Sequence, residues 1–195
     1  MIINENGLTR AIKRAWKAGG YTVLRNGELV MVYSDAWCVV CPREIFPRKA
    51  LGAIAEHAGF MPDDGEAYRI NKGGDQQVEN FQIAMDTVKY WQAAGVVQDA
   101  EMTRVNFSGY QLLQDMALTE GVRRLHGVSV ENLDILEWAV ARDRKAVVSN
   151  GKRAIYTEDM EAVALGLISG ETFAERDEDR KAQIWAELEQ TDLRS

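Results

Sequence analysis

Apolar residues recur at helical spacing in the opening segment of the chain, residues 7–18. The apolar face of this predicted helix carries Leu8, Ile12, Ala15 and Trp16. Basic side chains cover the other face, and Gly19-Gly20 ends the helix because glycine accepts the positive φ that a helix end often needs. A second helix is predicted over residues 47–57, with a proline in its first turn. Its predicted buried stripe is Leu51, Ile54 and Ala55.

Short β-rich runs follow the first helix. Residues 21–25 and 28–33 flank Asn26-Gly27, and Asn-Gly between such runs is the strongest short signal for a β-hairpin. Residues 37–41 predict a third strand, and residues 67–71 predict a fourth. This region is therefore predicted to be a small antiparallel sheet with amphipathic helices packed on it.

Helical spacing also recurs in longer segments, which are predicted to be helices over residues 75–94, 108–120, 129–142, 157–168 and 172–190. Their predicted N-caps include Asp75, Ser129 and Thr157. A strand is predicted over residues 122–127. A second hairpin is predicted to join residues 145–149 to residues 152–156 through Asn150-Gly151.

Hairpins among many amphipathic helices predict an α+β fold, in which helices pack on short antiparallel hairpins, rather than a doubly wound parallel sheet. The chain length suits one domain or two small ones. We expect an N-terminal α+β unit over residues 1–95. We expect a C-terminal α+β unit over residues 96–195, which contains the hairpin 145–156, and the two units can equally form one domain.

The composition is that of a folded globular protein, since 46% of the 195 residues are hydrophobic and 27% are charged. The first residues lack the basic start and apolar stretch of a secretory signal. The longest apolar run, residues 162–168, is far shorter than the roughly 20 residues of a membrane span. Two cysteines do not make a disulfide scaffold. The sequence therefore predicts a cytoplasmic protein without a membrane segment.

The net charge of −7 is unevenly distributed along the chain. Residues 1–50 carry a net charge of +4, and residues 51–195 carry −11. Such a split can mark a surface for a polar partner, although random clustering on a solvated surface gives the same pattern. The candidate contact residues are Arg10, Lys13, Arg14 and Lys17 on the first helix, and Glu175, Asp177, Glu178 and Asp179 near the C-terminus. The basic residues could contact nucleic acid phosphates, but the overall acidity of the chain and simple packing of the first helix are the competing interpretations.

The run Trp37-Cys38-Val39-Val40-Cys41-Pro42 follows an apolar strand and resembles the active-site segment of thioredoxins. In that family a Trp-Cys-x-x-Cys motif lies at a helix N-terminus, which makes one cysteine a better nucleophile. The resemblance implies that Cys38 attacks and that Cys41 resolves. However, Val39-Val40 is β-branched and favours a strand, in which both cysteines would be small buried apolar residues. A metal site would need two further ligands.

The opening from Gly7 to Val23 resembles small uncharacterised accessory proteins of bacterial phages and mobile elements. The resemblance extends through the segments Pro47-Arg48-Lys49-Ala50-Leu51 and Glu56-His57. It implies a non-enzymatic accessory protein that engages host machinery. Some acidic phage proteins of this size inhibit host defence complexes by occupying nucleic-acid channels.

Motifs for nucleotide binding and for a hydrolase nucleophile are absent from the sequence. His126 stands beside Arg123 and Arg124, where it could contact a phosphate, but the sequence places no partner that would make it a general base. We therefore expect no catalytic residue, cofactor or metal. The expected function is binding of an unidentified protein partner, as an inhibitor or regulator of a host complex. The alternatives are a thiol–disulfide protein that uses Cys38 and Cys41, and a nucleic-acid-binding regulator that uses the first helix.

Overall fold

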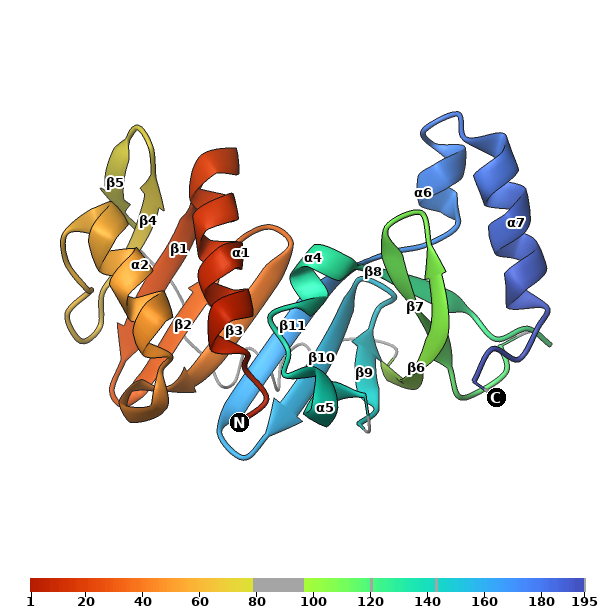
Figure 1. Cartoon of the computed structure of the whole chain (residues 1–195), viewed down its shortest axis with the longest axis horizontal. Coiled ribbons are helices and arrows are strands. Elements are labelled where there is room, and N and C mark those ends of the chain that lie inside the picture. Colours follow the sequence, from red (N-terminus) through yellow and green to blue (C-terminus); the bar gives the residue numbers. More distant parts are fainter. Residues whose placement is uncertain (79–96, 120, 143, 195) are drawn as a thin grey trace.

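The computed structural model describes residues 1–78, 97–119, 121–142 and 144–194, and it shows an α+β fold (Figure 1). Within these residues the strands form one 11-stranded sheet, in the order β10-β9-β6-β7-β8-β11-β3-β2-β1-β4-β5. The neighbouring strands run antiparallel throughout. The predicted fold class is confirmed.

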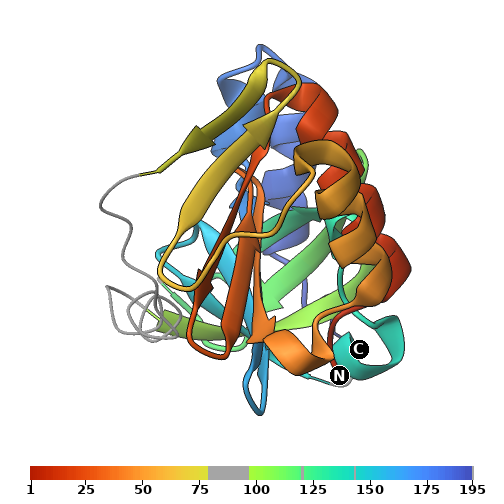
Figure 2. The same ribbon diagram turned by 90° about the vertical axis from the view of Figure 1, so that its left-hand side faces the viewer.

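The N-terminal part of the described chain builds one half of this sheet. Its strands are β1 (Tyr21–Asn26), β2 (Leu29–Tyr33), β3 (Trp37–Pro42), β4 (Ala67–Asn71) and β5 (Gly74–Gln77). Two helices, α1 (Glu5–Ala18) and α2 (Arg48–Ala58), lie side by side across one face of these strands (Figures 1 and 2). A 3-10 turn, η1 (Arg43–Ile45), leads from β3 towards α2. Helix α1 begins where the side chain of Asn4 accepts a hydrogen bond from the Gly7 N–H at 2.8 Å, so a side chain satisfies one of its free amides.

The remaining strands close into a small barrel. They are β6 (Val97–Phe107), β7 (Tyr110–Asp115), β8 (Leu125–Ser129), β9 (Ala146–Ser149), β10 (Arg153–Glu158) and β11 (Glu161–Ile168). The ring closes because β10 pairs with β9 on one edge and with β11 on the other. The outer edge of β11 is divided, since residues 162–165 pair with β3 and residues 167–168 pair with β8. Strand β11 therefore joins the barrel to the N-terminal sheet.

Both faces of the sheet are buried over much of its area. Successive residues of a strand point to opposite faces, so Val39 and Val163 enter the main core, while Val40 and Ala164 enter a second cluster. The main core lies under α1 and α2 and continues into the barrel, where side chains such as Leu113 fill the interior. The core is thus continuous between the two halves of the sheet.

The N-terminal segment closes one end of the barrel. Ile3 forms an antiparallel β-bridge with Leu136, and the Ile2 N–H donates to the buried carboxylate of Glu161 at 2.7 Å. Both isoleucines are almost fully buried. The opposite end contains the β9–β10 turn, the end of β7 and the start of β8.

Short helices follow the barrel strands. They are α4 (Val130–Leu133), α5 (Trp138–Ala141), α6 (Glu171–Ala174) and the longer α7 (Asp179–Glu189). Phe173 of α6 and Trp185 of α7 pack against Leu112 and Leu125, on the outer face of β7 and β8. This third apolar cluster fixes the α6–α7 pair at the side of the barrel away from α1 (Figure 1).

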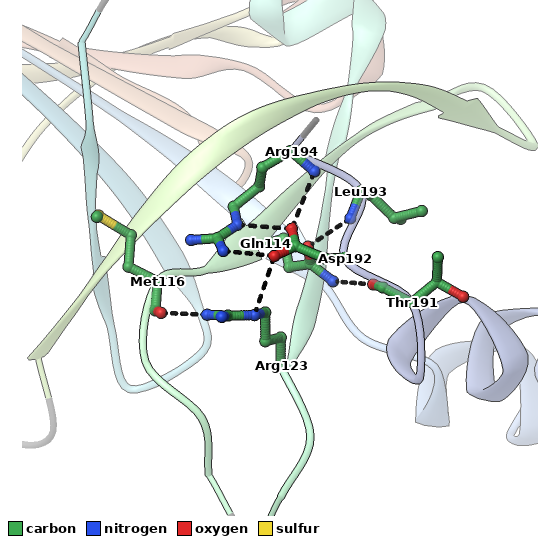
Figure 3. Close-up of polar contacts among 7 residues, drawn as sticks. All are labelled: Gln114, Met116, Arg123, Thr191, Asp192, Leu193 and Arg194. Carbon is green, nitrogen blue, oxygen red and sulfur yellow. Dashed lines mark hydrogen bonds and ion pairs between the residues drawn. The ribbon is translucent and has the colours of Figure 1, made fainter.

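The chain after α7 is held against β7 by one buried amide. Gln114 donates from Nε2 to the Thr191 carbonyl at 2.7 Å and accepts from the Leu193 N–H at 2.9 Å. Its side-chain amide thus supplies the donor and the acceptor that the backbone of a neighbouring strand would supply. Hydrogen bonds from Arg194 hold the pKa of Asp192 well below its usual range. Figure 3 shows the polar contacts of this tail, which involve Gln114, Met116, Arg123, Thr191, Asp192, Leu193 and Arg194.

Both predicted hairpins are confirmed. In the first, Asn26 pairs with Leu29, so the two-residue loop begins at Gly27, which has a φ of 57°. The turn therefore lies one residue later than predicted. In the second, Asn150 and Gly151 have φ values of 51° and 64°, which are the positive values that a type I′ turn requires.

The helix predicted over residues 47–57 is confirmed as α2, but its predicted buried face is partly wrong. Ile54 is buried, whereas Leu51 is 38% exposed and Ala55 also faces solvent. Ala50 is buried in place of Leu51.

Two predicted helices are wrong because their residues form strands, and a third is wrong at its start. Residues 110–115 of the segment predicted as the helix 108–120 form β7, and residues 157–168 form the end of β10, a turn and β11. Thr157 is therefore a strand residue rather than an N-cap. Asp75 pairs with Ile70 in β5, and residues 79–94 of the helix predicted to begin there lie outside the described residues.

Two predicted helices are each divided into shorter ones. The segment 129–142 contains α4 and α5, and the side chain of Ser129 does not cap α4. The segment 172–190 contains α6 and α7, separated by a turn in which Asp177 has a φ of 58°. A residue with positive φ cannot continue a right-handed helix, so the helix stops there.

Candidate functional site

Cys38 and Cys41 lie in the middle of the sheet, in β3. Three residues apart on a strand, they point to opposite faces: Cys41 belongs to the main core and Cys38 to the cluster behind it. Both thiols are free and buried, and burial raises the pKa of each to about 12. The geometry that a thioredoxin-like pair requires, two neighbouring sulfurs at a helix N-terminus, is not present at this position.

The predicted basic face of α1 lies close to acidic residues of neighbouring elements. Arg10 lies 3.1 Å from Asp134, and Arg14 lies 3.5 Å from Glu131 of α4. Lys13 lies 3.6 Å from Glu56 of α2. Lys17 is exposed near the end of the helix. These exposed pairs add little stability, but they partly cancel the positive potential that would attract a phosphate backbone.

The acidic C-terminal candidates lie in the turn between α6 and α7 and at the start of α7. Glu175, Asp177 and Asp179 are exposed, and Glu178 forms an ion pair with Lys181 at 2.8 Å. The structure therefore gathers these carboxylates at one tip of the α6–α7 pair. They lie on a different element from the basic residues of α1, so the two predicted contact groups do not form one surface (Figure 1).

An exposed aromatic surface, which was not among the contact residues predicted from the sequence, lies beside α1. Trp138 opens α5 and is 47% exposed, and Val130 at the start of α4 is 39% exposed. The two side chains border a hollow of about 310 Å³, which the buried residues Leu133 and Leu136 also line. We call these four residues the Trp138 surface.

Polar groups surround the Trp138 surface. The Arg10–Asp134 ion pair lies on its border, and Glu137 accepts a hydrogen bond from the side chain of Asn4 at 3.1 Å. Asn106 and the buried Gln111 also line the hollow, so apolar and polar side chains are mixed there, as they are in most protein-binding surfaces. Arg10, predicted from sequence as a contact residue, therefore lies beside an exposed aromatic side chain that could anchor a partner.

The two histidines have very different surroundings. His126 of β8 is buried inside the open end of the barrel, where its Nε2 lies 2.9 Å from Asp115 of β7. The sequence could not supply this partner, because only the pairing of β7 with β8 brings the two residues together. His57 of α2 stacks on Trp16 of α1, with 4.5 Å between the ring centroids.

The environment of His57 favours the neutral ring. Burial lowers the pKa of His57 below 6.5, with Glu56 acting to raise it and Lys13 to lower it further. The hydroxyl of Tyr21, whose own pKa burial raises, lies 3.2 Å from His57 Nδ1 and can donate to it only while that nitrogen is unprotonated.

Protonation of His57 is expected to quench the fluorescence of Trp16 and to lower the free energy of unfolding. The unfolded chain takes up this proton near pH 6.5, whereas the folded chain does so only at lower pH. The contribution of His57 to stability is therefore complete above pH 6.5 and declines as the pH falls from there through the folded-state pKa. Tryptophan fluorescence and urea unfolding between pH 7.5 and pH 4.5 measure both effects. The control is His57→Gln, which should remove this titration; an identical pH profile in that variant would contradict the assignment.

Metal centres and membrane-spanning helices are two further possibilities that the structure addresses. Within the described residues, groups of three or more His, Cys, Asp or Glu side chains that could hold a metal ion do not occur. Among the same residues, helices long and apolar enough to cross a bilayer are also missing. Comparisons of the chain with protein-family models, with curated proteins and with solved structures gave no match.

Proposed function

We propose that this chain is an accessory protein of the phage or mobile-element type that acts by binding another protein, and that the Trp138 surface is its main contact. The observation that carries this proposal is the exposure of Trp138 over a hollow that apolar and polar side chains line together. Tryptophan is enriched among the residues that dominate binding energy, particularly where polar neighbours exclude water. The partner would be a host protein whose activity is inhibited or regulated.

The fold supplies a rigid support for this surface. Leu133 and Leu136 are anchored in the main core, and the β-bridge between Ile3 and Leu136 ties the segment to the N-terminus. A surface that is ordered before binding loses less conformational entropy on association. Trp138 itself has few rotatable bonds, so a large apolar area can be buried at low entropic cost.

Trp138→Ala is expected to abolish capture of the partner. The experiment uses the immobilised full chain and nuclease-treated bacterial lysate, and it compares the protein with Trp138→Ala and Leu118→Ala. Leu118 is an exposed apolar residue on a loop outside the Trp138 surface, so its variant controls for non-specific apolar contacts. A stoichiometric protein retained by the natural chain and by Leu118→Ala, but lost with Trp138→Ala, supports the proposal. Capture that Trp138→Ala leaves unchanged would contradict it.

The acidic tip of the α6–α7 pair is tested in the same experiment. A variant with Glu175, Asp177, Glu178 and Asp179 all changed to lysine should weaken capture if this tip contributes through long-range attraction. Such a contribution would mainly slow association and would fall with added salt. Unchanged capture would remove the tip from the contact surface.

The two alternative functions have less support. The cysteines lie on opposite faces of β3 with their pKa values raised to about 12, which disfavours thiol–disulfide chemistry. Three of the four basic residues of α1 lie within ion-pair distance of an acid, which disfavours binding of a phosphate backbone. Material that is captured from untreated lysate but not from nuclease-treated lysate would favour the nucleic-acid alternative.

A further inference from the structure

The open end of the barrel contains a buried His–Asp pair. Leu113 of β7 is paired with His126 of β8, so His126 points into the barrel on the same face as Leu113 and Asp115. Asp115 is fully buried, and His126 is 5% exposed. The carboxylate of Asp115 accepts a hydrogen bond from His126 Nε2, which is therefore the protonated nitrogen.

Two polar atoms of this pair lack a hydrogen-bond partner among the described residues. Among the described residues, neither His126 Nδ1 nor Asp115 Oδ2 has a hydrogen-bond partner, although both atoms are buried. A buried polar atom without a partner costs free energy, and such atoms are uncommon in folded proteins. With Nε2–H donating to Oδ1, the Oδ2 atom of Asp115 is left as a buried acceptor. The pair thus offers a buried carboxylate oxygen to an N–H or O–H donor.

A cavity of about 250 Å³ lies against the pair. Its walls include Arg124, Val148 and the Asn150-Gly151 turn. The cavity shares Arg124, His126 and this turn with a larger groove of about 740 Å³, which Lys152 also lines and which extends to α7. The side chain of Arg124 is exposed and lines both spaces, so its positive charge lies where the cavity opens. The groove beyond it carries Lys152 together with Glu171 and Glu189.

The ends of this cavity differ in chemistry. The inner end has the Asp115 carboxylate oxygen, which requires an N–H or O–H donor, and the outer end has the guanidinium of Arg124, which prefers a carboxylate or phosphate. A simple cation would be repelled at the entrance by Arg124, and a simple anion would leave the inner acceptor without a partner.

We propose that this cavity binds a small molecule with an amino group at one end and a carboxylate or phosphate at the other. The amino group donates to Asp115 Oδ2, and the anionic end meets Arg124, with Lys152 beyond it in the groove. An α-amino acid and a nucleotide with an amino-bearing base share this chemistry. This site lies apart from the Trp138 surface, on the opposite end of the barrel.

Thermal unfolding and calorimetry of the full chain at pH 7.5 test the proposal. The two-ended probes are a mixture of the common α-amino acids, tested then one by one, and the purine nucleoside monophosphates. The one-ended probes are inorganic phosphate, acetate and methylammonium. We expect a saturable increase in Tm with one class of two-ended probe, and a much smaller effect of each one-ended probe. A response to amino acids or to nucleotides identifies the source.

Two variants locate the binding. Asp115→Asn replaces a charged acceptor with an amide of the same shape. Arg124→Ala removes a positive charge that lies at the mouth of the cavity and that the fold does not need. Each is expected to weaken binding roughly tenfold or more, which corresponds to the loss of one hydrogen bond to a charged group. Arg124→Ala keeps the test decisive if Asp115→Asn fails to fold. No Tm increase with any two-ended probe, equal binding of phosphate alone, or unchanged affinity in Arg124→Ala would overturn the proposal.

Discussion

Gly7→Ala is expected to lower the free energy of unfolding by about 3 kcal/mol, at the upper end of the range for overpacking a filled site. A Cβ atom on Gly7 would lie 1.6 Å from the carbonyl oxygen of Asp134 and 2.4 Å from its carbonyl carbon. Both are backbone atoms, so no side-chain rotation can relieve the clash. Helix α1 would have to move away from the segment after α4, and the neighbouring Ile3–Leu136 bridge would be disturbed.

Gly52→Ala is the matched control for this substitution. Gly52 lies within α2 and is exposed, and among the described residues a Cβ atom added to it would meet nothing within 4 Å. Alanine there should raise the free energy of unfolding by about 0.5–1 kcal/mol, because glycine loses more conformational freedom in a helix. Urea unfolding followed by circular dichroism compares the variants. Equal midpoints for Gly7→Ala and the natural chain would show that α1 and the Asp134 backbone are not in close contact.

The helix end at Gly19-Gly20 and the two hairpin turns could be predicted from sequence because their signals are local. The Gly19-Gly20 stop and the Asn26-Gly27 and Asn150-Gly151 turns act within a few residues, and all lie at or within one residue of the expected turns. Local chemistry of this kind does not depend on what the element later packs against.

The strands of the barrel could not be recognised in the same way. Most residues of β7 and β11 are buried whichever face they point to, because β7 lies between the core and the α6–α7 pair, and β11 between two apolar clusters. A strand buried on both faces loses the alternating pattern, and its apolar run resembles a buried helix. The helices predicted over residues 108–120 and 157–168 were wrong for this reason.

The candidate sites depend on contacts between distant segments. Asp115 becomes the partner of His126 only through the register of β7 and β8, and no local pattern connects the two residues. Trp138 offered a weaker signal, since it lies off the helical spacing of Leu133, Leu136 and Val140 in the segment 129–142, which was predicted to be a helix. A large aromatic residue away from a buried stripe is a candidate for an exposed binding surface.

Trp185→Ala is expected to lower the free energy of unfolding by about 3–5 kcal/mol, as for other buried aromatic residues. Trp185 is 1% exposed, and its ring centroid lies 5.5 Å from that of Phe173 and 6.0 Å from that of Phe107. The indole also donates to Glu189 at 3.3 Å. Its removal would leave a cavity between α7 and the barrel and would deprive Glu189 of a donor.

Trp138→Ala is the control for this loss, because nearly half of that residue is exposed and its removal should lower the free energy of unfolding by much less than that of Trp185. Circular dichroism at 222 nm is the appropriate signal, since both substitutions alter the fluorescence. The cluster around Trp185 is separate from the main core, so Trp185→Ala should destabilise the α6–α7 pair before the rest of the fold. Hydrogen exchange would then show reduced amide protection in α7, while the amide protection of β11 stays unchanged. Equal loss of protection in both would mean that the barrel cannot persist without the α6–α7 pair, and unchanged stability would mean that Trp185 is not the centre of this cluster.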